Sequence, residues 1–229
     1  MNTTSRAERR EHSVLVSTDS ITLEGNLVIP EGSRGIVLFA HGSGSSRFSP
    51  RNQFVARGLH EGRIATLLID LLTAEEERID LRTRQLRFDI DLLARRVVGA
   101  TDWLTRQPET RDLRIGTFGS STGAAAALIA AAERPEAVAA VVSRGGRPDL
   151  AMSVLDAVRA PTLLIVGGDD VPVIEMNREA LAKLRVEKKL EIIPGATHLF
   201  EEPGALEEVV RLARNWFQKH LAPAEDSFS

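Results

Sequence analysis

The chain has 229 residues, of which 43% are hydrophobic and 27% are charged, and this composition excludes an intrinsically disordered or collagen-like protein. The net charge of -3 at pH 7 gives no electrostatic basis for binding nucleic acid or a membrane surface. The absence of Cys excludes disulfides, thiolate metal ligands and a cysteine nucleophile. The polar N-terminus lacks the apolar stretch of a signal peptide, so we expect a cytoplasmic protein. Without a linker or repeat, residues 1–229 are expected to form a single domain with flexible ends at 1–11 and 222–229.

The first expected element is a β-hairpin. Apolar residues alternate with polar ones over 14–16 and again over 21–29, with a polar turn at 18–20 between them. Continuous apolar runs, typical of parallel strands covered on both faces, then follow at 35–40, 64–69, 115–118, 138–142, 162–166 and 190–193. Helical patterns fill most of the gaps, at 51–61, 84–106, 122–133, 150–157, 173–184 and 205–221, while 71–83 is expected to be a loop. This alternation predicts an α/β fold with a mostly parallel, doubly wound sheet of about eight strands and an antiparallel hairpin at one edge.

The residues just after each strand are candidates for the functional site, because ligands bind at the carboxyl ends of the strands in such sheets. After the run at 115–118 stands Gly119-Ser120-Ser121-Thr122-Gly123, which has the G-x-S-x-G spacing of a nucleophile elbow and is followed by an Ala-rich helix. Gly119 and Gly123 would let neighbouring segments approach the tight turn, and Ser121 is the predicted nucleophile. The competing interpretation is a serine that only caps the helix.

A serine hydroxyl needs a base, and the chain has five histidines. His198 follows the last apolar strand in a loop that opens toward the expected site, so we assign it as the base. Asp169 and Asp170 both follow the strand that ends at Val166, and the order Ser…Asp…His is that of α/β-hydrolases. On these grounds alone, either aspartate is the candidate partner of the histidine.

An oxyanion hole needs two preorganised N–H donors. We expect the backbone amide of Thr122 to supply one and that of Ser43, in the loop His41-Gly42-Ser43-Gly44, to supply the other. His41 is expected to fix this loop. The rival interpretation of the loop, a phosphate cradle, lacks the Lys-Ser/Thr ending of a P-loop.

These motifs together resemble the α/β-hydrolases, and most closely dienelactone hydrolase-like proteins, including hydrolase modules fused to phosphoribosyltransferases. The stretches that carry the resemblance are HGSGSSRFSPRN from His41, GSSTG from Gly119, VGGDD from Val166 and GATH from Gly195. The resemblance implies that Asp170 is the acid of the triad. The chain departs from this family in one respect. Dienelactone hydrolases proper use a cysteine nucleophile, which this chain lacks, and Ser121 in that position points to ordinary ester hydrolysis.

The interval after the strand that ends near Val142 leaves no room for a cap domain, so the site is expected to be open and suited to short acyl groups. Arg47 and Arg144 are candidate contacts for the substrate. Neither a cofactor nor a metal is expected, because no His/Asp/Glu cluster has metal-site spacing. Apolar residues of the C-terminal helix, such as Trp216 and Phe217, would serve a homodimer if they were exposed.

The sequence therefore favours a carboxylesterase-type serine hydrolase that acts on a small-molecule ester through an acyl-enzyme. Two alternatives remain. One is a thioesterase, acyltransferase or peptidase with the same triad, and the other is a non-catalytic binding module that retains the fold.

Overall fold

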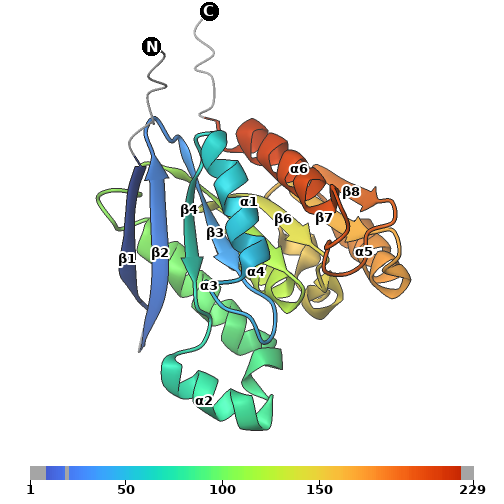
Figure 1. Cartoon of the computed structure of the whole chain (residues 1–229), viewed down its shortest axis with the longest axis horizontal. Helices are drawn as coiled ribbons and strands as arrows, with labels where there is room; N and C mark the ends of the chain where they lie inside the picture. Colours follow the sequence, from blue (N-terminus) through green and yellow to red (C-terminus); the bar gives the residue numbers. More distant parts are fainter. Residues whose placement is uncertain (1–8, 19–20, 223–229) are drawn as a thin grey trace, which may run out of the picture.

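The computed structural model describes residues 9–18 and 21–222. Its centre is an eight-stranded sheet with the strand order β1-β2-β4-β3-β5-β6-β7-β8. The strands are β1 (Arg9–Ser17), β2 (Thr22–Pro30), β3 (Gly35–Ala40), β4 (Ala65–Ile69), β5 (Arg114–Ser120), β6 (Val138–Arg144), β7 (Thr162–Gly167) and β8 (Lys188–Ile193). Strands β3 to β8 are parallel, and β1 and β2 run antiparallel at one edge (Figure 1). The predicted sheet and its hairpin are confirmed.

The hairpin begins earlier than the sequence suggested. Residues 9–11, which we assigned to a flexible end, pair with Val28, Ile29 and Pro30 of β2. That part of the expectation is wrong, because polar side chains at an edge strand do not prevent backbone pairing. At the other expected flexible end, Ala222 is described and accepts a hydrogen bond from Arg114. Residues 1–8 and 223–229 lie outside the described residues, as do positions 19 and 20 of the predicted turn.

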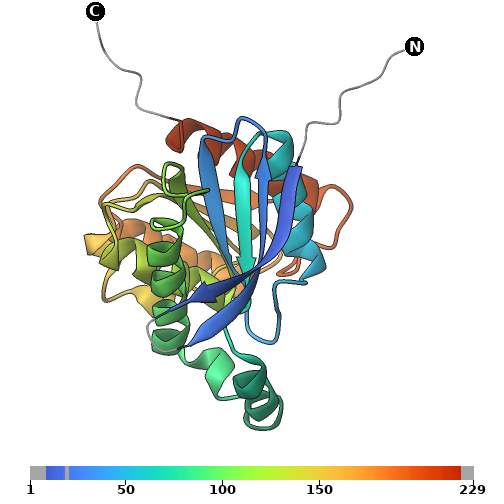
Figure 2. The same ribbon diagram turned by 90° about the vertical axis from the view of Figure 1, so that its left-hand side faces the viewer.

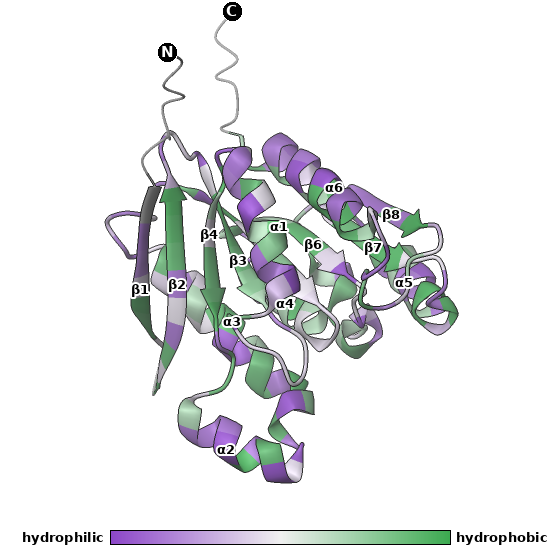
Figure 3. Ribbon diagram, in the orientation of Figure 1, coloured by the Kyte–Doolittle hydropathy of each residue, from purple (hydrophilic) through white to green (hydrophobic). Residues whose placement is uncertain are grey.

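Helices cover both faces of the sheet (Figure 2). They are α1 (Pro50–Glu61), α2 (Ala74–Thr83), α3 (Ile90–Leu104), α4 (Thr122–Glu133), α5 (Val171–Lys183) and α6 (Ala205–His220). One core cluster joins α1 and α6 to the sheet, and a second joins α3 and α4 to the opposite face. In Figure 3 the central strands are hydrophobic and the outer surfaces of the helices are hydrophilic, as burial on both faces of the sheet requires.

Two segments differ from the prediction. Residues 74–83, expected as a loop, form α2, which begins with a capping box in which Thr73 and Glu76 exchange side-chain-to-backbone hydrogen bonds. Residues 150–157, expected as one helix, are largely taken up by two short 3-10 helices, η2 (Pro148–Ala151) and η3 (Leu155–Ala157). A third, η1 (Leu86–Phe88), precedes α3.

Helix α6 contributes to the core through the apolar face that the sequence singled out. Phe217 is fully buried, Trp216 is 9% exposed, and both pack in the cluster that α6 shares with α1 and the sheet. No helix in the described ranges is long and apolar enough to cross a bilayer.

Strands β3 and β4 point downward in Figure 1, and α2 projects beyond their carboxyl ends. Between β6 and β7 the chain forms only η2, η3 and their connections, so no cap domain is inserted there. The edge at which the sequence places Ser121 and His198 is therefore left uncovered by any inserted domain.

Candidate active site

Ser121 occupies a strained turn between β5 and α4. Its backbone has φ 49° and ψ -123°, a conformation that non-glycine residues rarely adopt and that is concentrated at functional sites. The residue is partly buried, and its side chain makes no capping hydrogen bond to α4. The geometry is thus that of a nucleophile elbow, and the hydroxyl is not used in the way the capping interpretation requires.

The two glycines of the elbow allow this turn to form. A Cβ at Gly123 would lie 2.3 Å from the carbonyl oxygen of Ala40, and a Cβ at Gly119 would lie 2.4 Å from the Cα of Ala124. Both clashes are with backbone atoms, which cannot move aside without shifting a strand or a helix. Glycine at these positions therefore lets β3, β5 and α4 converge beneath Ser121.

His198 and Asp170 come together from two different loops. The Nδ1 atom of His198 donates to Oδ2 of Asp170 over 2.6 Å. Asp170 stands at the N-cap position of α5, yet its carboxylate makes no cap hydrogen bond and is directed to the imidazole instead. Asp169 is exposed, and its backbone amide bonds to Ala196. Of the two aspartates that the sequence left open, Asp170 is the one beside the histidine.

The imidazole lies close to the end of β6. A Cβ at Gly145 would stand 3.5 Å from Nδ1 of His198, an ordinary contact distance, so the ring lies beside this residue. Gly145 has φ 50°, and its amide donates to Ile165 of β7 over 2.8 Å. With Nδ1 bonded to Asp170, the Nε2 atom is left as the proton acceptor of the ring.

The loop after β3 lies against Ser121. A Cβ at Gly42 would be 3.1 Å from the Cβ of Ser121, and the Ser45 amide donates to Gly42 to close a tight turn around Ser43. Thr122 is the first residue of α4, where backbone amides have no partner within the helix. The two amides that we predicted as oxyanion donors, those of Ser43 and Thr122, therefore belong to the two segments next to Ser121: the loop after β3 and the first turn of α4.

His41 holds this loop through both ring nitrogens. Its Nε2 accepts the amide proton of Leu71 at 3.0 Å, so Nδ1 carries the ring proton and donates to the carbonyl of Gly42 at 2.9 Å. Burial lowers the pKa of His41, while the hydrogen bond to Gly42 and the charge of Asp70 act in the opposite direction. The side chain thus has the structural position that the sequence suggested, and it is held neutral.

The neutral state of His41 predicts that the protein loses stability in mild acid. Because the pKa of His41 is lower in the folded than in the unfolded chain, its contribution is complete above the unfolded value of about 6.5 and declines as the pH falls toward the folded value. The slope is at most about 1.4 kcal/mol per pH unit. Urea unfolding between pH 7.5 and 5 measures it.

Two variants separate His41 from other groups that titrate in this range. Gln at 41 retains an acceptor for Leu71 but takes up no proton, so His41→Gln is expected to flatten the decline. The pKa of His220 is also lowered by burial, and this residue lies at the end of α6. His220→Gln is therefore the matched control, because it shows how much of the decline in stability comes from a histidine outside the loop. Unchanged pH dependence in His41→Gln would contradict the assignment.

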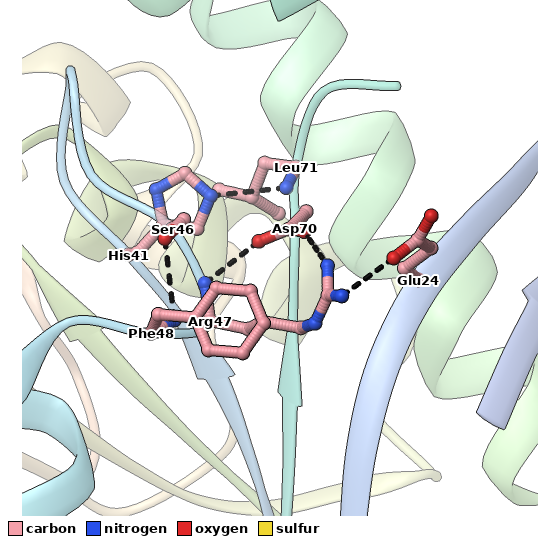
Figure 4. A network of polar contacts seen from close by, with 7 residues as sticks. All are labelled: Glu24, His41, Ser46, Arg47, Phe48, Asp70 and Leu71. Atoms are coloured by element: carbon pink, nitrogen blue, oxygen red, sulfur yellow. Dashed lines mark hydrogen bonds and ion pairs between the residues drawn. The ribbon is translucent and has the colours of Figure 1, made fainter. Parts of the chain in front are cut away.

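Arg47, which we predicted as a substrate contact, is bound within the protein. Its guanidinium pairs with Asp70 at the end of β4 and with Glu24 of β2, and its amide donates to the Asp70 carboxylate over 2.7 Å (Figure 4). These contacts, with those of His41, fasten the loop to the neighbouring strands. The residues that make these contacts line a cavity of about 530 Å³ beside the loop. Arg47 is thus placed to hold the loop after β3 in position. The sequence could not reveal this role, because the partners of Arg47 are 23 positions away.

A second arginine, Arg87, also contacts this loop. Arg87 of η1 pairs with the buried Asp80 of α2 through both its backbone amide and its Nε. A Cβ at Gly44 would lie 2.8 Å from Nη1 of Arg87, so the guanidinium rests on the loop.

Arg144, the other predicted contact, is the last residue of β6 and lies opposite Ser120 in the strand register. It is 7% exposed, and its carbonyl accepts the amide proton of Ser121 over 3.3 Å. Across the described ranges, no group of three His, Asp or Glu side chains is placed to hold a metal ion.

Comparison with known proteins places the chain among hydrolases. The sequence profile of the dienelactone hydrolase family matches residues 24–221. The crystal structure of a dienelactone hydrolase from Anabaena variabilis is 66% identical, with a TM-score of 0.92 over 93% of this chain and 99% of that one. Est1E from Butyrivibrio proteoclasticus, at 16% identity and a TM-score of 0.77 over 92% of this chain and 99% of its own, shares the fold.

Two proteins from Mycobacterium tuberculosis strains, which carry the name of a phosphoribosyl transferase, are 55% identical over 93% of this chain. The match covers 47% of their length, so the chain spans about half of these curated relatives. This agrees with the resemblance to hydrolase modules in longer proteins. From its profile match and its likeness to the Anabaena structure, the chain belongs to the dienelactone hydrolase family, whose fold is that of the α/β-hydrolases.

Proposed function

We propose that the protein is a serine hydrolase that cleaves small carboxylic esters through an acyl-enzyme. The observation that carries this proposal is the pairing of His198 with Asp170 at the strand edge where Ser121 stands in its strained turn. A carboxylate bonded to Nδ1 fixes the tautomer that leaves Nε2 free to accept a proton. The family assignment supports hydrolysis as the reaction class.

The reaction begins when the Oγ atom of Ser121 attacks the ester carbonyl carbon and its proton passes to Nε2 of His198. The carbonyl oxygen becomes an oxyanion, which the amides of Ser43 and Thr122 stabilise. The imidazolium, stabilised by Asp170, gives its proton to the departing alcohol, and the acyl group remains on Ser121. A water molecule then loses a proton to His198, attacks the acyl carbon and releases the carboxylic acid as the Ser121 hydroxyl re-forms.

The open edge favours short acyl groups. The β6–β7 interval carries no cap, and long acyl chains need an enclosed apolar channel to be desolvated. The segments bordering the elbow are the loop after β3, which exposes Phe48, and the loop that carries His198, which exposes Leu199. The expected preference for small esters therefore rests on the lack of an inserted cap between β6 and β7.

A fluorophosphonate tests the proposal directly. Treatment of the purified protein, followed by peptide mass spectrometry, should give one adduct per chain, located on Ser121. Parallel assays with 4-nitrophenyl esters should show the highest kcat/KM for acetate and butyrate and a decline toward longer chains. An unlabelled protein, or an adduct on a different serine, would favour the non-catalytic module that retains the fold.

A further inference from the structure

A cavity of about 350 Å³ lies at the amino-terminal edge of the parallel strands. Three segments enclose it: the turn that leads into β3, the turn between α1 and β4, and the end of α6 (Figure 1). Its apolar lining comes from Ile64, Phe217 and Leu221, which also belong to the core cluster that α1 and α6 form with the sheet. Cavities of about 150 Å³ in protein interiors take up benzene, so this cavity is large enough for a phenyl ring.

Arginines form the rim of this cavity. Arg34 and Arg63 line it, and both side chains are exposed. Arg63 extends toward the turn that precedes Arg34, since a Cβ at Gly32 would lie 3.9 Å from its Cδ and Nη1 atoms. Arg114 stands beside them at the start of β5, where its backbone amide donates to the carbonyl of Arg34 over 3.4 Å. The rim therefore gathers positive charge from three separate segments.

The described carboxylates do not compensate this charge. Within the described ranges none of the three rim arginines forms an ion pair, whereas Arg214 of α6 is paired with Glu61. The described residues that line the cavity include no acid. An apolar cavity with a cationic rim fits a partner in which a large apolar side chain stands next to carboxylates.

The described chain ends at the cavity itself. Ala222 belongs to the lining, and its carbonyl accepts a hydrogen bond from Nη1 of Arg114 over 2.7 Å. The next seven residues, segment 223–229, have the sequence Pro-Ala-Glu-Asp-Ser-Phe-Ser and lie outside the described ranges. They comprise two acidic residues, one aromatic residue and no basic residue. Seven residues span up to about 23–25 Å when extended, which is enough for Phe228 to turn back from Ala222 into the cavity.

We propose that segment 223–229 docks in this cavity, with the ring of Phe228 against the apolar lining and the carboxylates of Glu225 and Asp226 beside the rim arginines. Burial of the ring supplies the larger share of the free energy of docking, and ion pairs between exposed side chains add less. The docked segment joins the end of α6 to the turns that precede β3 and β4.

Residues 1–8 are the competing occupant, because Arg9 pairs with Pro30 at the same edge of the sheet. They hold one acidic residue, one basic residue and no aromatic residue. Segment 223–229 carries the complementary charge and follows directly from the lining, so it is the occupant that fits. The docking is independent of the proposed hydrolysis, since Ser121 lies at the opposite edge of the sheet.

A nitroxide label on the segment tests the docking. The chain has no cysteine, so Ser227→Cys gives a single site for the label in the full chain. Neighbouring side chains of an extended segment point to opposite sides, so the label faces away from the cavity when Phe228 occupies it. At low ionic strength the electron paramagnetic resonance spectrum should be dominated by a slow-motion component. High salt should increase the fast component, because salt screens attraction between exposed charges.

Two variants of the labelled protein should release the segment. Phe228→Ala removes the ring and should lower the ratio of docked to free segment by more than about tenfold. Arg34→Gln combined with Arg63→Gln removes two rim charges and should lower this ratio by about threefold to tenfold. The matched control is Arg82→Gln combined with Arg106→Gln, which removes the same charge from exposed positions outside the cavity. This control should leave the spectrum unchanged.

Three results would overturn the proposal. Fast motion alone in the otherwise unaltered chain would show that the segment is not docked. Slow motion that persists in both Phe228→Ala and the Arg34/Arg63 variant, or that falls equally in the control, would place the segment on a different surface. A slow component that disappears on dilution would mean that a second copy of the chain holds the segment.

Discussion

Ser121→Ala is expected to lower kcat for 4-nitrophenyl acetate by about 10⁵- to 10⁶-fold and to abolish labelling by a fluorophosphonate. Ala cannot form the acyl-enzyme, and only oxyanion stabilisation and binding remain to assist direct attack by water. Because Ala and Ser bear similar strain at φ 49°, the free energy of unfolding should change little. Steady-state kinetics combined with urea unfolding measure both quantities.

The neighbouring serine provides the control. Ser120 is 3% exposed and belongs to β5, so Ser120→Ala removes a hydroxyl of the same size from the same turn. It should keep kcat within a few-fold of the wild type. If Ser120→Ala proved to be the inactive variant, the elbow would present the other hydroxyl and the assignment of the nucleophile would be wrong.

Asp170→Asn should reduce kcat by about 10²- to 10⁴-fold with a much smaller change in KM. The amide has nearly the shape of the carboxylate but carries no charge, so it neither stabilises the imidazolium nor favours the tautomer with the proton on Nδ1. The measurement is kcat against pH from 6 to 9, which distinguishes the loss of a base from a simple shift in its pKa.

Asp169→Asn is the adjacent control for this prediction. Asp169 is exposed, and only its backbone amide bonds to the loop that carries His198. Its substitution should leave kcat close to the wild-type value. Equal losses in the two variants would indicate that the loop between β7 and α5 responds to any loss of charge, and Asp170 would then have no special role.

The parts of the fold that the sequence predicted are those encoded by neighbouring residues. A buried parallel strand is a short apolar run, and an elbow is five consecutive positions, so β5, Ser121 and α4 were recognisable from residues 114–133. The same holds for the absence of a cap between β6 and β7, which follows from chain length alone.

Helix α2 was missed because it buries little apolar surface. Of its residues only Asp80 is buried, so the helix has no apolar stripe of the kind that reveals α6. Its formation depends on the cap at Thr73, the acidic first turn and the pairing of Asp80 with Arg87. The Thr-x-x-Glu spacing was visible in the sequence, but the ion pair was not.

The two arginines show why substrate contacts are harder to predict than a triad. Arg47 and Arg144 looked alike as cations beside strand ends. One pairs with acids from β2 and β4, and the other is enclosed without an acid. This difference depends on which segments meet in space, and no spacing along the chain encodes it.

The strand register has a consequence for how this unit can be linked to others. Arg9 pairs with Pro30, and the carbonyl of Ala222 accepts a hydrogen bond from Arg114 at the start of β5, so both ends of the described chain lie at the amino-terminal edge of the parallel strands. Ser121 lies at the opposite edge. A polypeptide joined at either end would leave from this amino-terminal edge, and small molecules could still diffuse to Ser121 without obstruction. This geometry suits a module that can be carried within a longer polypeptide, as in the curated relatives that are about twice its length.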